Sequence, residues 1–202
     1  MLKVSKKFSR GDSIIEVLFA VTIFSALAIS GLSVMNRGVG TAQRSLEVSL
    51  VRQEMNSQAE VLRFMHDSYV SGANTPPAEK WKEIISSTNV ISNTNLASLG
   101  SLINSCAPPA SRAFIINPRT LAVVSNATVN VFAPAQVYST IRYNPDNTIR
   151  QNGVEGLWVQ QLQGSSGGTS YRDFHIRACW NAPGGNVPVT LGTIVRLYDP
   201  AL

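Results

Sequence analysis

Side chains that could do chemistry are few in this sequence of 202 residues. It has two histidines, His66 and His175, and two cysteines, Cys106 and Cys179. Asp173 and His175 are two residues apart in a predicted strand, so their side chains lie on the same face of it. We interpret them as a surface hydrogen bond rather than a catalytic dyad. Neither cysteine has a second Cys or a His at metal-ligand spacing. We therefore predict no catalytic residue, no metal site and no cofactor, and we expect that the protein is not an enzyme.

Three weaker signals have structural interpretations. Asp146 stands in an Asn-Pro-Asp-Asn stretch, and one carboxylate among amides favours a turn over a calcium site. The segment 164–168 lacks the strand-to-helix elbow that a nucleophilic serine in a G-x-S-x-G motif needs. The three tryptophans are expected in the core or on a sheet face rather than in a ligand cage; they are Trp81, Trp158 and Trp180.

The net charge of +5 is unevenly placed. Four basic residues precede the first acidic one, Asp12; they are Lys3, Lys6, Lys7 and Arg10. Without residues 1–11 the chain keeps 13 basic and 12 acidic side chains. No basic stripe remains to bind phosphates, so we expect no nucleic-acid partner.

An uncharged segment of 19 residues, Val17–Met35, follows this basic start. As a helix it would be about 28 Å long, close to the thickness of a bilayer core. The segment is too long for the apolar part of a secretory signal peptide. The basic residues should keep the N-terminus cytoplasmic and leave the rest translocated. We predict a single-pass membrane precursor with its head outside the cytoplasm, in the periplasm or at the cell surface.

Glu16 lies at the edge of this apolar segment and has two interpretations. An ionisable residue at such a place suggests a functional role, because burying a carboxylate in a bilayer costs on the order of 3 kcal/mol. The run Ser13 to Glu16 also fits the S-x-x-E capping box, in which the Glu side chain reaches back to the cap residue. The two roles are compatible.

The run Arg10–Leu18, with its basic leader and apolar helix, resembles the prepilin cleavage and N-methylation motif of type IV pilins and pseudopilins. In that family a peptidase cuts after a Gly, and a Glu stands at the fifth mature position. Gly11 matches the cleavage residue, Asp12 becomes the new N-terminus, and Glu16 falls at the fifth position. The family usually has Phe or Met where this chain has Asp12, a departure that bears on N-methylation more than on cleavage.

Residues 41–70 continue the helical periodicity without proline. One apolar face should pack on the protein's own sheet; it comprises Val48, Val51, Met55, Ala59, Leu62, Met65 and Tyr69. A second, narrower line belongs either to the core or to contacts with neighbouring subunits; it comprises Leu46, Leu50, Val61 and Phe64. Gly31, Gly38 and Gly40 mark where the helix should bend or melt, each at a cost of roughly 1 kcal/mol.

Beyond residue 70, Pro76 and Pro77 are expected to end the helix. Short helices are expected at 78–85 and 96–103, followed by strands at 113–116, 121–125, 128–132, 136–143, 157–163, 171–180 and 192–197. The predicted fold class is α+β, with a long N-terminal helix on an antiparallel sheet, as in pilins. The predicted organisation is a leader (1–11), a transmembrane and assembly helix (12–36), an amphipathic helix tail (37–70), a connecting segment (71–112) and a β-rich head (113–202).

In an exported head, Cys106 and Cys179 are expected to form a disulfide, with two buried free thiols as the alternative. The resemblance implies a structural subunit of a type IV pilus-like filament, major or minor, whose partners are prepilin peptidase, the membrane before assembly and other pilin subunits. Two alternatives stay open: a pseudopilin of a type II secretion or DNA-uptake machine, and a membrane-anchored surface adhesin that never polymerises.

Overall fold

The computed structural model describes residues 14–72, 74–86, 90–91, 113–125, 135, 137–182 and 187–199. The chain divides into two compact units between Gln43 and Arg44. The first unit contains the start of helix α1, and the second contains the rest of α1 and the sheet. The layout is α+β, with a long apolar N-terminal helix and an antiparallel sheet.

Helix α1 runs from Ile14 to Val70 without interruption. It ends where Gly72 adopts a left-handed conformation, with φ of 70°. The Ser71 N–H donates to Asp67 O (3.0 Å) across this last turn. Glycine is the residue that most easily takes this conformation at the end of a helix.

Helix α2, Pro76–Ile85, corrects one expectation about the two prolines. They begin the second helix rather than merely ending the first, because a proline in the first helical turn lacks only an N–H that would have no helical partner. The 78–85 prediction therefore holds with two residues added at the start. Trp81 and Ile84 of α2 are fully buried.

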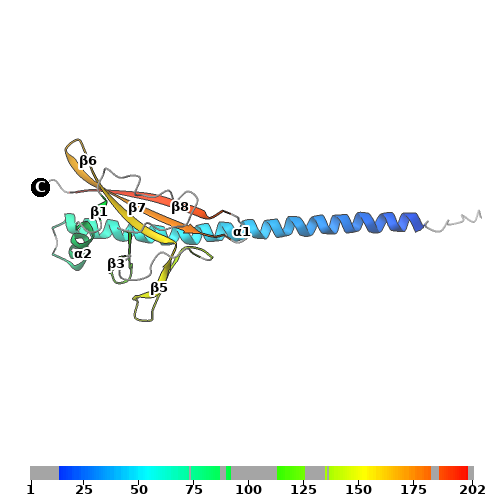
Figure 1. Ribbon diagram of the computed structural model, residues 1–202, viewed down its shortest axis with the longest axis horizontal. Coiled ribbons are helices and arrows are strands. Elements are labelled where there is room, and N and C mark those ends of the chain that lie inside the picture. Colours follow the sequence, from blue (N-terminus) through cyan, green and yellow to red (C-terminus); the bar gives the residue numbers. More distant parts are fainter. Residues whose placement is uncertain are drawn as a thin grey trace, which may run out of the picture. The chain divides into compact units, whose positions relative to one another are not determined.

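Among the described residues the main sheet contains six strands, five of them in the order β3-β2-β6-β7-β8. Its strands are β1 (Val90–Ile91), β2 (Ala113–Ile116), β3 (Val123–Ser125), β6 (Leu157–Ser166), β7 (Thr169–Trp180) and β8 (Val189–Tyr198). β1 pairs in parallel with β6, and the other pairs are antiparallel. Strands β4 (Thr140–Tyr143) and β5 (Ile149–Glu155) form a separate two-stranded sheet. In Figure 1 the long strands β6, β7 and β8 lie side by side.

Several strand predictions need correction. The predicted strand 157–163 ends too early, because β6 continues to Ser166 and the hairpin closes at Gly167 and Gly168, both with positive φ. This is the glycine-rich chemistry of a two-residue hairpin. β3 begins at Val123, because Leu121 has a φ of 60°. β4 begins only at Thr140.

Two strands were not predicted, β1 and β5. β1 has only two residues, and β5 was missed because Arg150, Gln151 and Asn152 near its start are polar and exposed. The predicted strand 128–132 and the predicted helix 96–103 lie outside the described residues.

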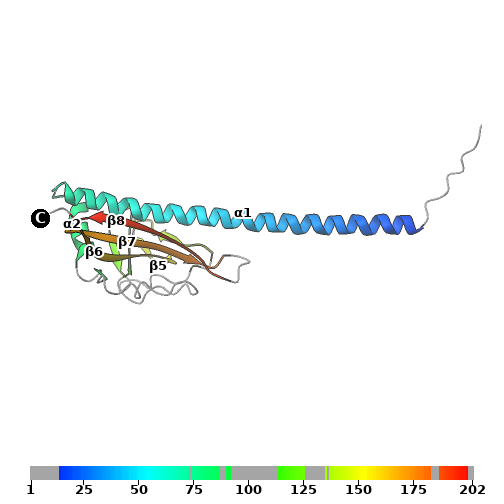
Figure 2. The same ribbon diagram turned by 90° about the horizontal axis from the view of Figure 1, so that it is seen from above.

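The core lies between the sheet and the second half of α1. Figure 2 shows this part of α1 along one face of the strands. Val51, Leu62 and Met65 are fully buried against Phe114 and Phe174 from the sheet. The prediction that this helix face packs on the protein's own sheet is therefore confirmed.

Candidate functional site

The first half of α1 is apolar and uncovered. It contains an 18-residue stretch with a mean hydropathy of 2.2, and none of that stretch is buried. Phe24 is 73% exposed and Leu27 is 67% exposed. By length and composition this helix could cross a membrane.

Glu16 lies in the first turn of α1 and is exposed. The hydroxyls farther along bond within the helix: Thr22 Oγ1 donates to Phe19 O (2.8 Å) and Ser30 Oγ donates to Ala26 O (2.7 Å). Among the described residues, no group hydrogen-bonds the Glu16 carboxylate. A negative group in the first turn is favoured by the helix dipole, and its side chain remains available to a partner.

The other residues of the predicted motif are the leader, Gly11, Asp12 and the cap residue Ser13. They lie outside the described residues. Cleavage, N-methylation and the capping box therefore stay predictions.

Gly31, Gly38 and Gly40 are all helical. A Cβ built at any of them would have nothing within 4 Å beyond the helix itself. Packing within this chain therefore does not require glycine at these positions. The prediction that they allow the helix to bend is untested.

Most of the second apolar line on α1 lies outside the core, although Val61 packs against it. Leu46 is 60% exposed and Phe64 is 54% exposed, while Leu50 and Val61 are partly covered. Of the two interpretations left open, this exposure favours contacts outside the subunit.

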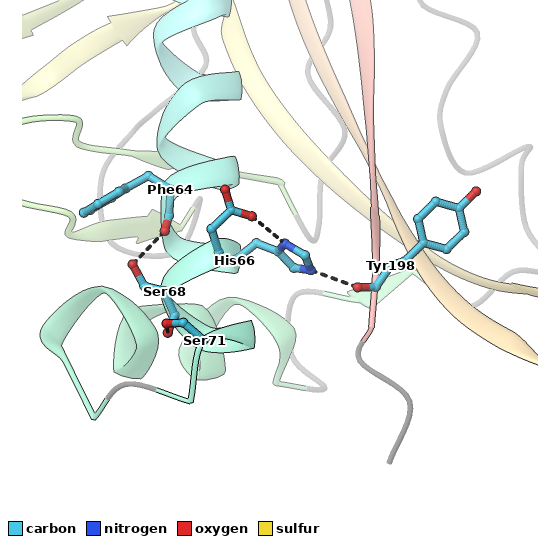
Figure 3. Close-up of polar contacts among 6 residues, drawn as sticks. Phe64, His66, Ser68, Ser71 and Tyr198 are labelled. Carbon is cyan, nitrogen blue, oxygen red and sulfur yellow. Dashed lines mark hydrogen bonds and ion pairs between the residues drawn. The ribbon is translucent and has the colours of Figure 1, made fainter.

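His66 connects the end of α1 to the end of β8. Its Nε2 lies 2.9 Å from Tyr198 O, and its Nδ1 lies 3.3 Å from Asp67 Oδ1. Its ring meets Trp81 edge to face, with 5.1 Å between the centroids. Figure 3 shows the imidazole between the helix and the last residue of the strand. Because a carbonyl only accepts, Nε2 must carry a proton here.

The serines beside His66 do not form a nucleophilic site with it. Ser68 Oγ donates to Phe64 O (2.8 Å), as Figure 3 shows. Ser71 Oγ donates to Ser68 O (2.9 Å). Both serine hydroxyls thus donate to backbone carbonyls, and Nδ1 of the imidazole lies beside the Asp67 carboxylate, so neither serine donates its proton to His66. The His66 side chain therefore has a structural role, because its hydrogen bond joins the end of α1 to the end of β8.

The other polar candidates have local partners. Asp173 accepts two hydrogen bonds of 2.7 Å from Arg196 rather than one from His175. Asp146 Oδ1 accepts from the Thr148 hydroxyl (2.6 Å) and N–H (3.0 Å), and these bonds lower the pKa of the Asp146 carboxyl. No group of three metal-ligating side chains occurs in the part of the chain that the structure describes. Asp146 therefore belongs to a turn, as its sequence predicted.

Two buried polar contacts were not foreseen from the sequence. Gln58 on α1 donates from Nε2 to Ile116 O (2.7 Å) and accepts from Ile116 N–H (2.9 Å). Glu47 on α1 accepts a hydrogen bond from the Trp180 indole N–H (3.0 Å). Gln58 and Glu47 stand in a run that otherwise reads as an ordinary amphipathic helix. Only their positions beside the core-facing line could have indicated a buried role.

The three tryptophans are buried, as expected of core residues. Cys179 is also buried and is disulfide-bonded. Cys106, the only other cysteine in the sequence, lies outside the described residues. The Cys106–Cys179 pairing stays a prediction; we expect thiol labelling under denaturing conditions to find no free cysteine, and two labelled thiols would contradict the pairing.

Comparisons with protein-family models, with curated proteins and with solved structures found no match.

Proposed function

We propose that this protein is a type IV pilin-like filament subunit, made as a membrane-inserted precursor, cut after Gly11 and polymerised through its N-terminal helix. The observation that carries the proposal is the first half of α1, which is apolar on all sides and has no buried residue. Such a surface needs a cover other than water.

The same helix would serve in two environments. Before assembly it would lie in lipid, and in a filament it would pack against the helices of other subunits. Each large apolar side chain that leaves water contributes about 1.5–3 kcal/mol. These side chains stay out of water when the helix moves from lipid into a core of packed helices. Assembly therefore does not lose this free energy.

Glu16 would determine the axial register of neighbouring subunits. Cleavage after Gly11 would create an α-amine at Asp12, largely protonated at neutral pH and in apolar surroundings where a lone cation is costly. Glu16 lies four residues beyond that terminus. An axial offset of about 6 Å between parallel helices would therefore bring it beside a neighbour's amine. Pairing would neutralise two poorly solvated charges.

The exposed line of Leu46 and Phe64 supports the same proposal. It lies on the part of α1 that already packs on the sheet through another face. A subunit that works alone has no need of this second line. In a filament it would contact the helix of a neighbouring subunit.

The proposal is tested by N-terminal sequencing of the protein recovered from sheared surface filaments. A chain that starts at Asp12 is expected. A chain in the filaments that starts at Met1 would contradict cleavage. Absence of the protein from filaments would favour the anchored adhesin, and recovery only with a secretion machine would favour the pseudopilin.

The role of Glu16 is tested by Glu16→Gln, which keeps a hydrogen-bonding side chain but removes the charge. We expect this variant to insert in the membrane and fold normally but to be lost from filaments. Normal incorporation would leave only the capping role. Ser30→Ala, which removes a hydroxyl already bonded within the helix, is the matched control.

A further inference from the structure

Two asparagines of the β4–β5 hairpin have a left-handed backbone, Asn147 with a φ of 64° and Asn152 with a φ of 56°. Asparagine takes this conformation more readily than most residues other than glycine. The two differ in the residue that follows them, because Asn147 precedes Thr148 and Asn152 precedes Gly153. Glycine has no side chain to hinder an attack by its backbone nitrogen on the carboxamide of the preceding residue.

Asn152 and Gly153 lie in an irregular part of the hairpin. The two strands pair at Ile141 with Val154 and at Tyr143 with Ile149, so Arg142 alone stands opposite residues 150–153. A bulge of this kind disrupts the ladder locally. The peptide bond between Asn152 and Gly153 therefore lies where the regular pairing of β4 with β5 is broken.

The bulge requires glycine at position 153. A Cβ built there would lie 2.6 Å from Arg150 O and 2.7 Å from Arg142 O, and both of these oxygens belong to the backbone. Position 152 in turn favours Asn, Asp or Gly because its φ is positive. The fold thus restricts both positions to small sets of residues, and this chain has a carboxamide next to a glycine there.

The two carboxamides also differ in their contacts. Asn147 Oδ1 accepts a hydrogen bond from Arg119 Nη1 (2.9 Å). Asn152 is exposed, and among the described residues no group hydrogen-bonds its side chain. Rotation of the Asn152 side chain toward the Gly153 nitrogen therefore breaks no such bond, whereas the Asn147 carboxamide must first leave Arg119.

We propose that Asn152 is a site of covalent self-modification, at which the Gly153 nitrogen attacks the side-chain carbonyl carbon of Asn152. A bond forms between Gly153 N and Asn152 Cγ, and the bond from Cγ to Nδ2 breaks. The Nδ2 group takes the Gly153 amide proton and leaves as ammonia. Water then opens the resulting succinimide at either carbonyl and gives aspartate or isoaspartate. The reaction is neither an oxidation nor a reduction, and water is its only co-reactant.

The burial of Gly153 does not prevent this reaction. The attacking nitrogen and the carboxamide belong to adjacent residues, so no external reagent has to reach Gly153. Water has to reach only the succinimide, which forms at the exposed Asn152. The modification is independent of filament assembly through α1.

The products should weaken the hairpin. Isoaspartate adds one carbon atom to the backbone beside Gly153, where the chain already lies close to Arg142 O and Arg150 O. Strand β4 places Ile141 in the core and Tyr143 against it. Because β5 pairs with β4, a longer backbone in β5 should loosen this packing and lower the melting temperature.

The test uses the full-length chain in neutral detergent micelles, incubated for days at mildly alkaline pH. Peptide mass mapping should show a gain of about 1 Da, from the exchange of –NH₂ for –OH, in the peptide that contains Asn152. The gain should appear at least about tenfold faster there than at Asn147, which corresponds to a barrier lower by about 1.4 kcal/mol. An isoaspartate methyltransferase should label part of the product at the same residue.

Asn152→Gly is the matched variant, because glycine accepts the positive φ but has no carboxamide. Its peptide should gain no mass, and its melting temperature should stay constant during the incubation while that of the parent chain falls. Asn147→Gly makes the same change at the other left-handed position and leaves Asn152 in place. It should be modified at Asn152 like the parent chain.

Two outcomes would overturn the proposal. The first is an Asn152 peptide that gains no mass, or gains it no faster than the Asn147 peptide, which would show that the folded bulge prevents the attack. The second is modification only in denaturant, which would assign the reactivity to the Asn-Gly sequence in an unfolded chain and not to the hairpin.

Discussion

The two halves of α1 use the same apolar residue types in different surroundings. Leu27 in the first half is 67% exposed, whereas Leu62 in the second half is fully buried. The first half is apolar on every side, and the second has one core-facing line with polar residues around most of the rest. A helix apolar all round requires lipid or other helices, whereas a single face can be covered by the protein's own sheet. Helix α1 therefore has one part that the protein's own sheet covers and one part that needs lipid or other helices.

The largest effect should come from removing the first half of α1. A chain that starts at Arg44, where the second compact unit begins, retains the core-facing line and every strand that the structure describes. We expect it to be soluble and to unfold cooperatively, and to lose all membrane and filament association. Circular dichroism melting and membrane flotation measure the two properties. Aggregation of this chain under oxidising conditions would place the boundary elsewhere.

The same substitution in the two halves should have opposite consequences. Leu62→Ala removes fully buried side-chain volume and should destabilise the second unit by about 3 kcal/mol in denaturant unfolding. Leu27→Ala removes the same atoms from an exposed position and should leave that unfolding unchanged. A similar loss in both variants would show that the two halves share one core.

A smaller effect should follow from the polar contact between α1 and β2. Gln58→Ala leaves the Ile116 N–H and C=O without their side-chain partner, and should cost about 1–3 kcal/mol. Gln53→Ala, at an exposed position of the same helix, is the control and should be nearly neutral. Equal stability of the two variants would show that water replaces the Gln58 amide.

The smallest effect should depend on pH. Burial raises the pKa of Glu54 above its ordinary value of 4.5, against the opposing attraction of Arg119. Tyr143 faces the same carboxyl, and burial together with Glu54 raises the pKa of its phenol to about 12. Because the folded state holds the Glu54 proton more tightly than the unfolded state, its contribution to stability is full below pH 4.5 and is lost as pH rises.

Glu54→Gln cannot ionise and should therefore be more stable than the parent chain at pH 7 and equal to it near pH 3. Thermal melting at both values measures the difference. Glu60→Gln, which removes only an exposed pair with Arg63, should shift stability little at either pH. A Glu54→Gln variant less stable at pH 7 would show that attraction to Arg119 outweighs burial.

Local sequence patterns predicted the elements whose apolar residues become buried in the fold. The bounds of β2 were predicted correctly, because it is a short apolar run beside a turn. β7 differed by only two residues at its start. β5 was missed because polar residues follow Ile149, and the strand is defined by its pairing with β4, a contact that no local pattern contains.

In the candidate site, too, local features could be predicted from the sequence and contacts between distant residues could not. The exposed apolar half of α1 and the position of Glu16 follow from composition and spacing along the chain. The hydrogen bond between His66 and Tyr198 could not be predicted, because it joins residues 132 positions apart in the sequence. Neither could the buried contact of Gln58 with Ile116, which joins residues 58 positions apart.

The sequence by itself determined that α1 is helical, which of its faces is apolar, and which runs could become strands, because these depend on backbone preference and on periods of 3.6 and 2 residues. Only the tertiary structure decided which apolar line is buried, which polar side chains are taken into the core, and the order of the strands in the sheet. Each of these depends on contacts between distant segments, where burial and hydrogen-bond satisfaction act on many residues at once.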